Sequence, residues 1–509
     1  MEPTTRQFKD NAKEALVDAQ LQDALAKLGR GFPLRRLEAA ARLPEFEALR
    51  DEAREIKNHV LDNLDFYLEA YEAKVVASGG QVHWCKDAED ARRTIAEICQ
   101  KAGAKTVTKS KSMIGEEIAI NDYLEDAGIT PVETDLGEYI IQLRREPPSH
   151  IIAPAIHLSM GQVEETFRES HQDLDPARSL DEPRKLLEEA RNKLRTEFLG
   201  ADVGLTGANM LIAETGSNVL VTNEGNADLT YSLPRVHIVM ASLEKIVPTL
   251  EDASTILRVL ARSATGQDMS VYTTFCTGVR RPEDLDGPDE YHVVLLDNGR
   301  SQLIGTEFHE MLRCIRCGAC LNHCPVYRSV GGHAYGWVYS GPMGAVLIPG
   351  LIGMDEAAEL PNASTLCGRC ESVCPMRIPL PKMLRAWRQK HYESKRSGAL
   401  GRWLLGAWAA LARRPKLYRR MMGLGVAILG QMGRRHGRFR RLPFAGGWTG
   451  GRDLPAPNGD TFVAQWHRCA RGDAIGLARV GEAPRHEIAG WDTQVMLRAG
   501  RLYSQVCYQ

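Results

Sequence analysis

The sequence has 509 residues, of which 43% are apolar and 25% are charged, and its formal net charge is -1. A chain of this length exceeds what one hydrophobic core supports, so we expect two or three domains. The balanced charge argues against a nucleic-acid footprint over the whole protein, and we expect no nucleic-acid partner. No apolar run reaches the roughly 20 residues that a membrane-spanning helix needs.

The first 73 residues predict a helical N-terminal segment. In FEALRDEAREIKNHVLDNLDFYLEAYEAK, apolar residues recur every three or four positions and charged residues fill the opposite face. The first twenty residues alternate charges with helix formers and lack the apolar centre of a signal peptide. We therefore expect a compartment in which thiols stay reduced, the cytoplasm.

Residues 74–300 predict an α/β domain. Short β-branched runs are separated by helical stretches such as AEDARRTIAEICQKAG. The expected strands lie within residues 75–85, 106–112, 130–135, 150–156, 218–223, 235–242 and 291–297. Alternation of this kind implies a largely parallel sheet.

Lys109, Ser110, Lys111 and Ser112 follow one expected strand and open a helix. Unpaired N–H groups and two ammonium groups at such a turn suit a carboxylate or a phosphate. Charged turns between strands and helices are also commonly just solvated. Both interpretations remain open at this point.

Residues 301–394 contain two cysteine runs between helical stretches. The first run, Cys314, Cys317, Cys320 and Cys324 followed by Pro325, has the spacing of bacterial ferredoxins. In that pattern three thiolates hold one [4Fe-4S] cube and the fourth reaches a second cube. Zinc is the rival metal, but zinc knuckles use paired cysteines and give no reason for the third cysteine or for the Cys-Pro end.

The second run repeats the first with one cysteine replaced. Aligned on its Cys-Pro end, it has serine at position 364, where the first run has a cysteine. The predicted ligands are Cys314, Cys317, Cys320 and Cys374 for cluster 1, and Cys324, Cys367 and Cys370 for cluster 2. Ser364, water or a partner side chain then completes cluster 2, unless that cluster has three irons. Alternatively, Ser364 only caps a turn.

Residues 395–509 predict a basic C-terminal region with an atypical tail. Thirteen Lys or Arg residues lie between Lys395 and Arg441, and no acidic residue follows Glu393 until Asp453. They surround two apolar stretches, WLLGAWAALA and MMGLGVAILGQM. This pattern is typical of a helix lying in an anionic membrane interface, and it equally suits an acidic partner or a helix pair that packs internally.

The chain resembles the lactate utilization protein B family of bacterial L-lactate oxidation systems. The resemblance is carried by KSKSMIGEEIAIN, TGANMLIAETGSNVLVTNEGN, LPRVHIVMASLEKIVPTLEDA, both cysteine runs and RLPFAGGWTGGRDLPAP, and it covers about residues 5–466. It implies a lactate-utilization domain of the CoA-transferase or ribose-isomerase type and a helical ferredoxin module with two [4Fe-4S] clusters. Partner proteins A and C are also implied, and the family's seven cluster cysteines map onto the seven cysteines named above.

Two functional hypotheses follow. In the first, this chain relays electrons from lactate, oxidised to pyruvate, through the two cubes to a downstream acceptor. In the second, it is itself a hydroxyacid-oxidising subunit with a site in the α/β domain. The CoA-transferase resemblance also invites an acyl-carrying glutamate, Glu214 or Glu224, although the neighbouring glycines suit turns.

Overall fold

The computed structural model describes residues 3–395, 398–442, 449, 453–457 and 460–470. The chain divides into two compact units, Met1–Arg396 and Ser397–Gln509. The first unit contains the N-terminal helices, the α/β region and both cysteine runs. The second contains the basic region.

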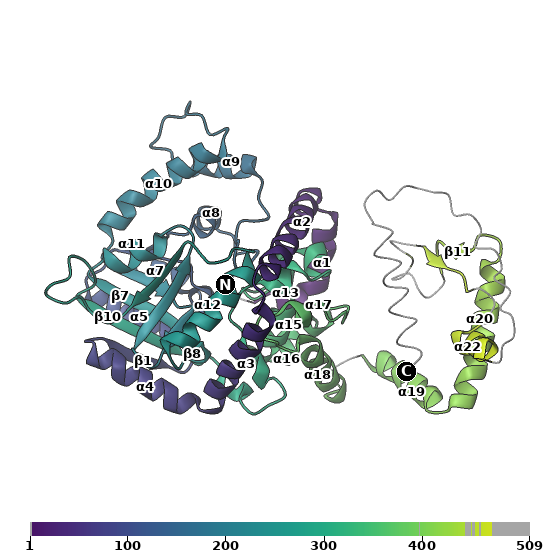
Figure 1. Cartoon of the computed structure of the whole chain (residues 1–509). Helices are drawn as coiled ribbons and strands as arrows, with labels where there is room; N and C mark the ends of the chain where they lie inside the picture. The colour runs from purple at the N-terminus through teal and green to yellow at the C-terminus, as the bar shows by residue number, and fades with distance from the viewer. Residues whose placement is uncertain (1–2, 396–397, 443–448, 450–452, 458–459, 471–509) are drawn as a thin grey trace. The chain divides into compact units, whose positions relative to one another are not determined.

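A six-stranded parallel sheet forms the centre of the α/β region, with strand order β1-β10-β7-β4-β2-β3 (Figure 1). The strands are β1 (Gln81–Cys85), β2 (Thr106–Lys109), β3 (Thr130–Glu133), β4 (Val203–Gly207), β7 (Val236–Ser242) and β10 (Glu290–Leu296). Every residue of the central strand β7 is buried, as expected for a parallel strand covered on both faces. The expected parallel α/β architecture is confirmed.

Helices cover both faces of this sheet. Ile238 and Met240 belong to a core shared with α5 (Ala88–Lys101), α6 (Met113–Glu117) and α7 (Ile120–Asp126). Val239 and Ala241, the alternate residues of β7, belong to a core shared with α4 (Leu64–Ala77). Alternation along one strand therefore builds two separate hydrophobic layers.

A second sheet of four strands, in the order β8-β5-β6-β9, was not expected as such. Its strands are β5 (Met210–Ile212), β6 (Ser217–Thr222), β8 (Ile246–Val247) and β9 (Tyr272–Cys276). β5 and β6 form an antiparallel hairpin that turns at Gly216, where φ is 73°. The remaining helices of this region are α8 (Leu136–Arg144), α9 (Met160–Ser170), α10 (Pro183–Gly200), α11 (Asn226–Ser232) and α12 (Leu250–Ala264).

The strand expected at residues 150–156 is wrong, because this segment forms turns. The Ser149 hydroxyl and backbone N–H both donate to the Pro154 carbonyl and close the segment into a loop. Ile151 packs into the core that contains the cluster cysteines. The apolar residues of this run thus serve the cysteine region and not the sheet.

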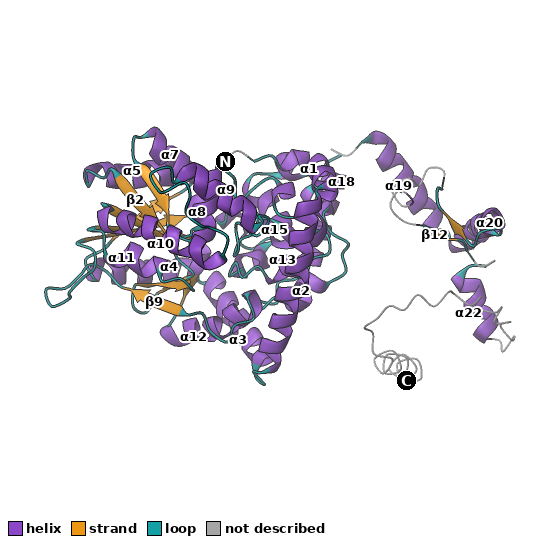
Figure 2. Ribbon diagram, turned by 90° about the horizontal axis from the view of Figure 1, so that it is seen from above, coloured by secondary structure: helices purple, strands orange, loops and turns teal. Residues whose placement is uncertain are grey.

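The N-terminal helices cover the cysteine region (Figures 1 and 2). They are α1 (Phe8–Val17), α2 (Ala19–Ala41) and α3 (Phe46–Asp62). The helices of the cysteine region are α13 (Ala319–Asn322), α14 (Tyr327–Val330), α15 (Gly341–Leu351), α16 (Met354–Ala357), α17 (Arg369–Val373) and α18 (Leu380–Glu393). α2 contacts α12, α13 and α14, and it therefore joins the two halves of the first unit. The expected helical character of the cysteine region is confirmed.

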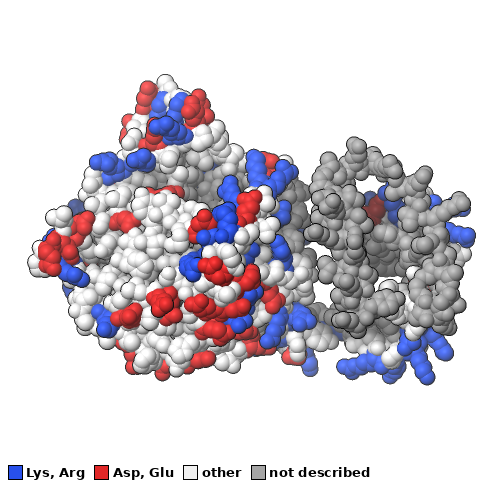
Figure 3. All heavy atoms as spheres, viewed as in Figure 1, with Lys and Arg blue, Asp and Glu red and all other residues white. Residues whose placement is uncertain are grey.

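The described part of the second unit contains α19 (Ala399–Ala412), α20 (Pro415–Gly433), β11 (Arg438–Phe439), β12 (Leu454–Pro455) and α22 (Phe462–Ala470). Large apolar side chains of α19 remain exposed, including Trp403 at 67% and Trp408 at 58%. Lys and Arg dominate the visible described surface of this unit in Figure 3. Among the described residues, no helix combines the length and apolarity needed to cross a bilayer.

Candidate iron–sulfur site and adjoining pocket

The two cysteine runs fold into the same local backbone. The residue before the second cysteine position has positive φ in both runs, 58° at Arg316 and 55° at Leu366. The glycine after that position, Gly318 or Gly368, is also left-handed and begins α13 or α17. Non-glycine residues with positive φ are uncommon and often mark functional sites. The structural repeat supports the alignment that places Ser364 opposite a cysteine.

Four cysteines line one cavity in the first unit: Cys314, Cys317, Cys320 and Cys374. Three of them come from the first run, and Cys374 comes from the second. Its other walls are largely apolar and include Ile151, Met343 and Ile378. All described cysteines are free of disulfides. Four thiols around a shared apolar cavity are a donor set that fits a [4Fe-4S] cube, and they are the set expected for cluster 1.

Burial favours the neutral form of the buried thiols of this set. Burial raises the pKa of Cys317 to about 12, and the nearby Cys374 adds to the shift. Burial also raises the pKa of Cys320 well above its ordinary value, with further contributions from Cys314 and Cys317. Thiolates packed this closely repel one another, so the set suits a cationic centre that deprotonates and neutralises them.

The other three cysteines form a second set. Burial raises the pKa of Cys370 to about 12, and Cys324 and Cys367 contribute to the shift. Cys367 is exposed, and the Arg369 N–H lowers its pKa. Cys370 in turn contributes to the raised pKa of Cys320 in the first set, so the two sets are neighbours.

Ser364 makes the hydrogen bonds of a turn residue. Its hydroxyl accepts from the Leu366 N–H at 3.1 Å, and its carbonyl accepts from Arg388 at 2.9 Å. These contacts match the alternative in which Ser364 caps a turn. Its role as a cluster ligand stays a prediction.

Two arginines of the N-terminal helices, which the sequence did not reveal, bind the loop that carries Cys374. Arg50 of α3 donates to the Cys374 and Ser372 carbonyls at 2.7 and 2.8 Å. Arg36 of α2 donates to the Val373 carbonyl at 2.9 Å. Both side chains are buried. Arg50 follows the buried Phe46 by one helical turn and lies on the buried face of α3. They bring positive charge to the cluster 1 cysteines.

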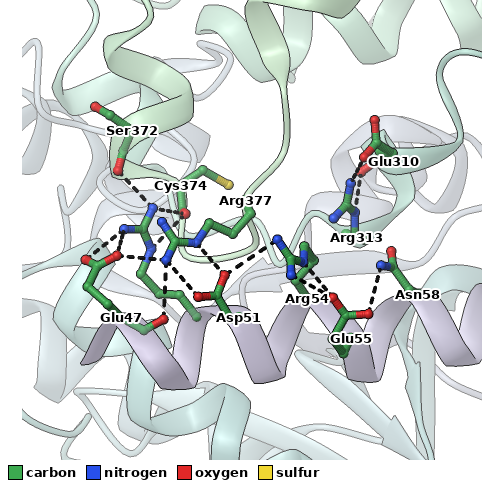
Figure 4. Close-up of polar contacts among 11 residues, drawn as sticks. Glu47, Asp51, Arg54, Glu55, Asn58, Glu310, Arg313, Ser372, Cys374 and Arg377 are labelled. Carbon is green, nitrogen blue, oxygen red and sulfur yellow. Dashed lines mark hydrogen bonds and ion pairs between the residues drawn. The ribbon is translucent and has the colours of Figure 1, made fainter. Parts of the chain in front are cut away.

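A row of partly exposed ion pairs also holds this loop against α3. Arg377 lies 3.0 Å from Asp51 and 2.9 Å from Glu47 (Figure 4). These contacts leave Arg377 partly exposed. The helix and the loop after Cys374 are thereby held in register.

A buried charge network joins the α/β region to the first cysteine run. Arg300 lies 2.5 Å from Glu117 and 3.2 Å from Glu244, and Arg316 lies 3.1 Å from Glu244. The Tyr339 hydroxyl donates to Glu117 at 2.5 Å. Burial pushes the pKa of Glu117 upward, but Arg300 outweighs it, and the pKa lies below its ordinary value.

A pocket of about 280 Å³ opens at the carboxyl ends of β2, β4 and β7. Ser110–Ser112, Gly207–Asn209 and Lys245 line it from these three strand ends, and Arg316 and Cys317 line it from the cysteine run. Crevices at this edge of parallel sheets commonly bind ligands. Three of the four residues of the expected anion site, Ser110–Ser112, therefore line a pocket, and anion binding there stays a prediction.

Lys109 does not belong to this pocket, which corrects the expectation. Its buried ammonium pairs with Glu116 at 2.7 Å and Glu133 at 2.6 Å. Successive side chains of an extended chain point to opposite faces of the sheet, so Lys109, the last residue of β2, points away from the side on which Ser110 lines the pocket. Its charge is already neutralised by protein carboxylates.

The two glutamates of the glycine-rich stretches have separate places. Glu214 accepts from the Leu250 N–H at 3.1 Å, at the start of α12. Glu224 lines the pocket and accepts from the Leu136 N–H at 3.2 Å. Burial raises the pKa of Glu224. The left-handed Gly225 beside it, with φ of 70°, has the conformation of a turn glycine.

Comparison with known protein families agrees with this architecture. Residues 68–296 match the LUD domain, and residues 310–378 match the 4Fe-4S dicluster domain. The dicluster match implies two [4Fe-4S] clusters. A crystal structure of a DUF162 family protein from Deinococcus radiodurans, 17% identical, covers 46% of this chain and 98% of its own, with a TM-score of 0.24.

Similar full-length relatives carry one name, lactate utilization protein B. The protein of Lysinibacillus sphaericus is 41% identical over 475 residues, which cover 93% of this chain and 99% of the relative. That of Bacillus licheniformis is 42% identical over 461 residues, 90% of this chain and 96% of the relative. That of Bacillus anthracis is 41% identical over 480 residues, which cover 92% of this chain and 98% of the relative. The chain therefore belongs to the lactate utilization protein B family, with a LUD domain and a 4Fe-4S dicluster domain.

Proposed function

We propose that this chain is an iron–sulfur electron-transfer subunit in the oxidation of L-lactate to pyruvate. The cavity lined by Cys314, Cys317, Cys320 and Cys374 carries the proposal, because it joins both cysteine runs around one donor set. Cys324, Cys367 and Cys370 are the proposed ligands of cluster 2. When bound, two neighbouring clusters supply single-electron transfer.

The exposures of the two cysteine sets suggest a direction for electron flow. The set of Cys314 is covered by N-terminal helices and adjoins the pocket at the end of the parallel sheet. The set of Cys370 includes Cys367, which is exposed. We place the entry of electrons at the first set and their exit at the second. The exposed position also leaves room for water or a partner side chain as the fourth ligand of cluster 2.

The partners in this proposal are lactate utilization proteins A and C, together with a downstream acceptor. We further propose that the chain works in the cytoplasm and binds peripherally to the inner face of a membrane. The exposed tryptophans of α19 and the absence of acidic residues between Glu393 and Asp453 support such a contact. The chain should co-sediment with anionic vesicles and stay in the supernatant with neutral vesicles. Equal binding to both would contradict the membrane contact.

A dye-reduction assay separates the relay from the catalytic alternative. We expect the isolated, cluster-loaded chain to reduce no dye with lactate, whereas its complex with proteins A and C does. Cys370→Ser should abolish dye reduction by the complex, and Cys85→Ser, a buried cysteine outside both sets, should preserve it. Turnover by the isolated chain would contradict a pure relay and support the hydroxyacid-oxidising hypothesis.

A further inference from the structure

The pocket at the end of the parallel sheet adjoins the cysteine cavity. Ile151, Ile315, Arg316 and Cys317 line both spaces. A molecule in the pocket would thus lie against a wall that includes Cys317, one of the cluster 1 cysteines. The volume of about 280 Å³ lies at the low end of ligand pockets, so the pocket suits a small molecule.

One of the pocket's cations forms no ion pair with any residue that the structure describes. Among the described residues, Lys245 has no hydrogen-bond or ion-pair partner, although it lines the pocket. Arg316 forms an ion pair with Glu244 at 3.1 Å, and its guanidinium carbon lies 5.0 Å from the centre of the Tyr339 ring. These two contacts fix the guanidinium. Lys111 lies 3.2 Å from Glu138. A partly buried, unpaired ammonium is costly unless an anion approaches it.

The pocket's two carboxylates are already engaged by backbone donors. Asp135 accepts from the Gly137 and Glu138 N–H groups, where it caps α8. Glu224 accepts from the Leu136 N–H. Both acids are thus held at the start of α8, and three cationic side chains face the rest of the pocket. Lys111 and Arg316 are paired with Glu138 and Glu244, so Lys245 supplies the uncompensated positive charge that favours an anionic ligand.

Neutral donors and apolar side chains complete the lining. In the described structure, the Ser110 hydroxyl makes no hydrogen bond, and Asn209 uses only its carbonyl oxygen, which accepts from the Val221 N–H at 2.9 Å. Met240 and Leu220 supply apolar wall. Hydroxyl and amide donors beside a cation match an acid with a second oxygen near its carboxylate, and the apolar wall matches a short alkyl group.

We propose that this pocket binds a small 2-hydroxy or 2-oxo monocarboxylate, with its carboxylate on Lys245 and Arg316. The choice of acid rests on the proposed function, whereas the anion site rests on the pocket alone. The site places substrate or product on this chain, beside Cys317. The chain then contributes to substrate binding besides relaying electrons.

Calorimetry on the cluster-loaded full chain, titrated anaerobically with pyruvate, tests this site. We expect Lys245→Met to weaken binding at least tenfold and Lys245→Arg to weaken it less. Lys193→Met is the matched control, because Lys193 pairs with Asp173 outside the pocket, and it should bind as the wild type does. No pyruvate binding by the wild type, equal binding by Lys245→Met, or preferential binding of inorganic phosphate would each overturn the proposal.

The EPR spectrum of the dithionite-reduced chain provides a second readout. Pyruvate should change the signal of cluster 1 in the wild type and leave that of Lys245→Met unchanged, at equal iron content. This result is independent of lactate oxidation. If pyruvate binds but lactate never reduces the clusters in the complex, the relay is wrong and the pocket stands. If lactate reduces them but pyruvate neither binds nor changes the signal, the pocket is wrong and the relay stands.

Discussion

Arg300→Met should break the charge network that joins the α/β region to the first cysteine run. The Arg300, Glu117 and Glu244 side chains are at most 2% exposed. Removing the guanidinium leaves Glu117 with Tyr339 and Asn298 as donors, and Glu244 with Arg316. Both carboxylates remain buried, and each loses a cationic partner.

We expect this substitution to lower the free energy of unfolding by about 3–5 kcal/mol, the usual cost of breaking a buried ion pair. The double substitution with Glu117→Met should recover part of the loss, because it removes one of the stranded carboxylates. The matched surface control is Arg235→Met. Arg235 is half exposed and pairs with Glu290, so its loss should cost about 1 kcal/mol or less.

The deficit of Arg300→Met should also depend on pH. In the wild type the pKa of Glu117 lies below 4.5, so its stabilising contribution is complete above that pH and is lost as the pH falls through the folded-state pKa. Without Arg300, burial dominates and raises that pKa above 4.5. Protonation then relieves the penalty, and the gap to the wild type should shrink from pH 7 to pH 5.

Anaerobic urea unfolding of the cluster-loaded chain, followed by circular dichroism at both pH values, measures these differences. A loss below about 1 kcal/mol at pH 7, equal to that of Arg235→Met, would show that the network does not hold the two regions together. A gap that widens toward pH 5 would contradict the assigned charge state of Glu117.

Three further predictions concern single side chains. Ser364→Ala should retain the full iron content and EPR spectrum, because Ser364 acts in a turn; loss of the cluster 2 signal would make it a ligand. Arg50→Met should lower the midpoint potential of cluster 1 and leave cluster 2 unchanged in a redox titration, with partial rescue by Arg50→Lys; an unchanged potential would contradict the electrostatic role. Burial lowers the pKa of Lys57 from its ordinary value of 10.5 to about 7 in the folded chain. Below pH 7 the folded chain therefore buries a charged ammonium at a cost in unfolding free energy. This cost falls as the pH rises from 7 toward 10.5, because the folded chain then holds the neutral amine. The unfolding free energy should therefore rise from pH 7 to pH 9 in the wild type relative to Lys57→Met, and parallel pH profiles would refute this.

Local patterns in the sequence predicted the parts of the fold that depend on local chemistry. Fully apolar runs such as that of β7 predict buried parallel strands, because both faces must be covered. The cysteine spacing predicts a shared metal centre, because it sets which thiols one turn presents together. The alignment of the second run also located Ser364, and the repeated positive φ at Arg316 and Leu366 shows that the two turns match in structure.

Long-range contacts supplied what the sequence could not reveal. Arg50 lies on the buried face of α3, but no local pattern shows that its guanidinium donates to the carbonyls of the Cys374 loop. Lys245 follows a strand without any motif, and its place beside Cys317 depends on how two distant segments meet. The run at 150–156 has strand composition, but Pro154 and the Ser149 contacts fold it into a loop. Such outcomes depend on tertiary packing and not on local pattern.

Redox-titrated EPR on the anaerobic complex with proteins A and C tests the relay most directly. We expect two interacting [4Fe-4S] signals that appear when lactate is added, and a single remaining signal, from cluster 1, in Cys370→Ser. A colourless preparation that carries zinc, or clusters that stay oxidised in the presence of lactate, would contradict it.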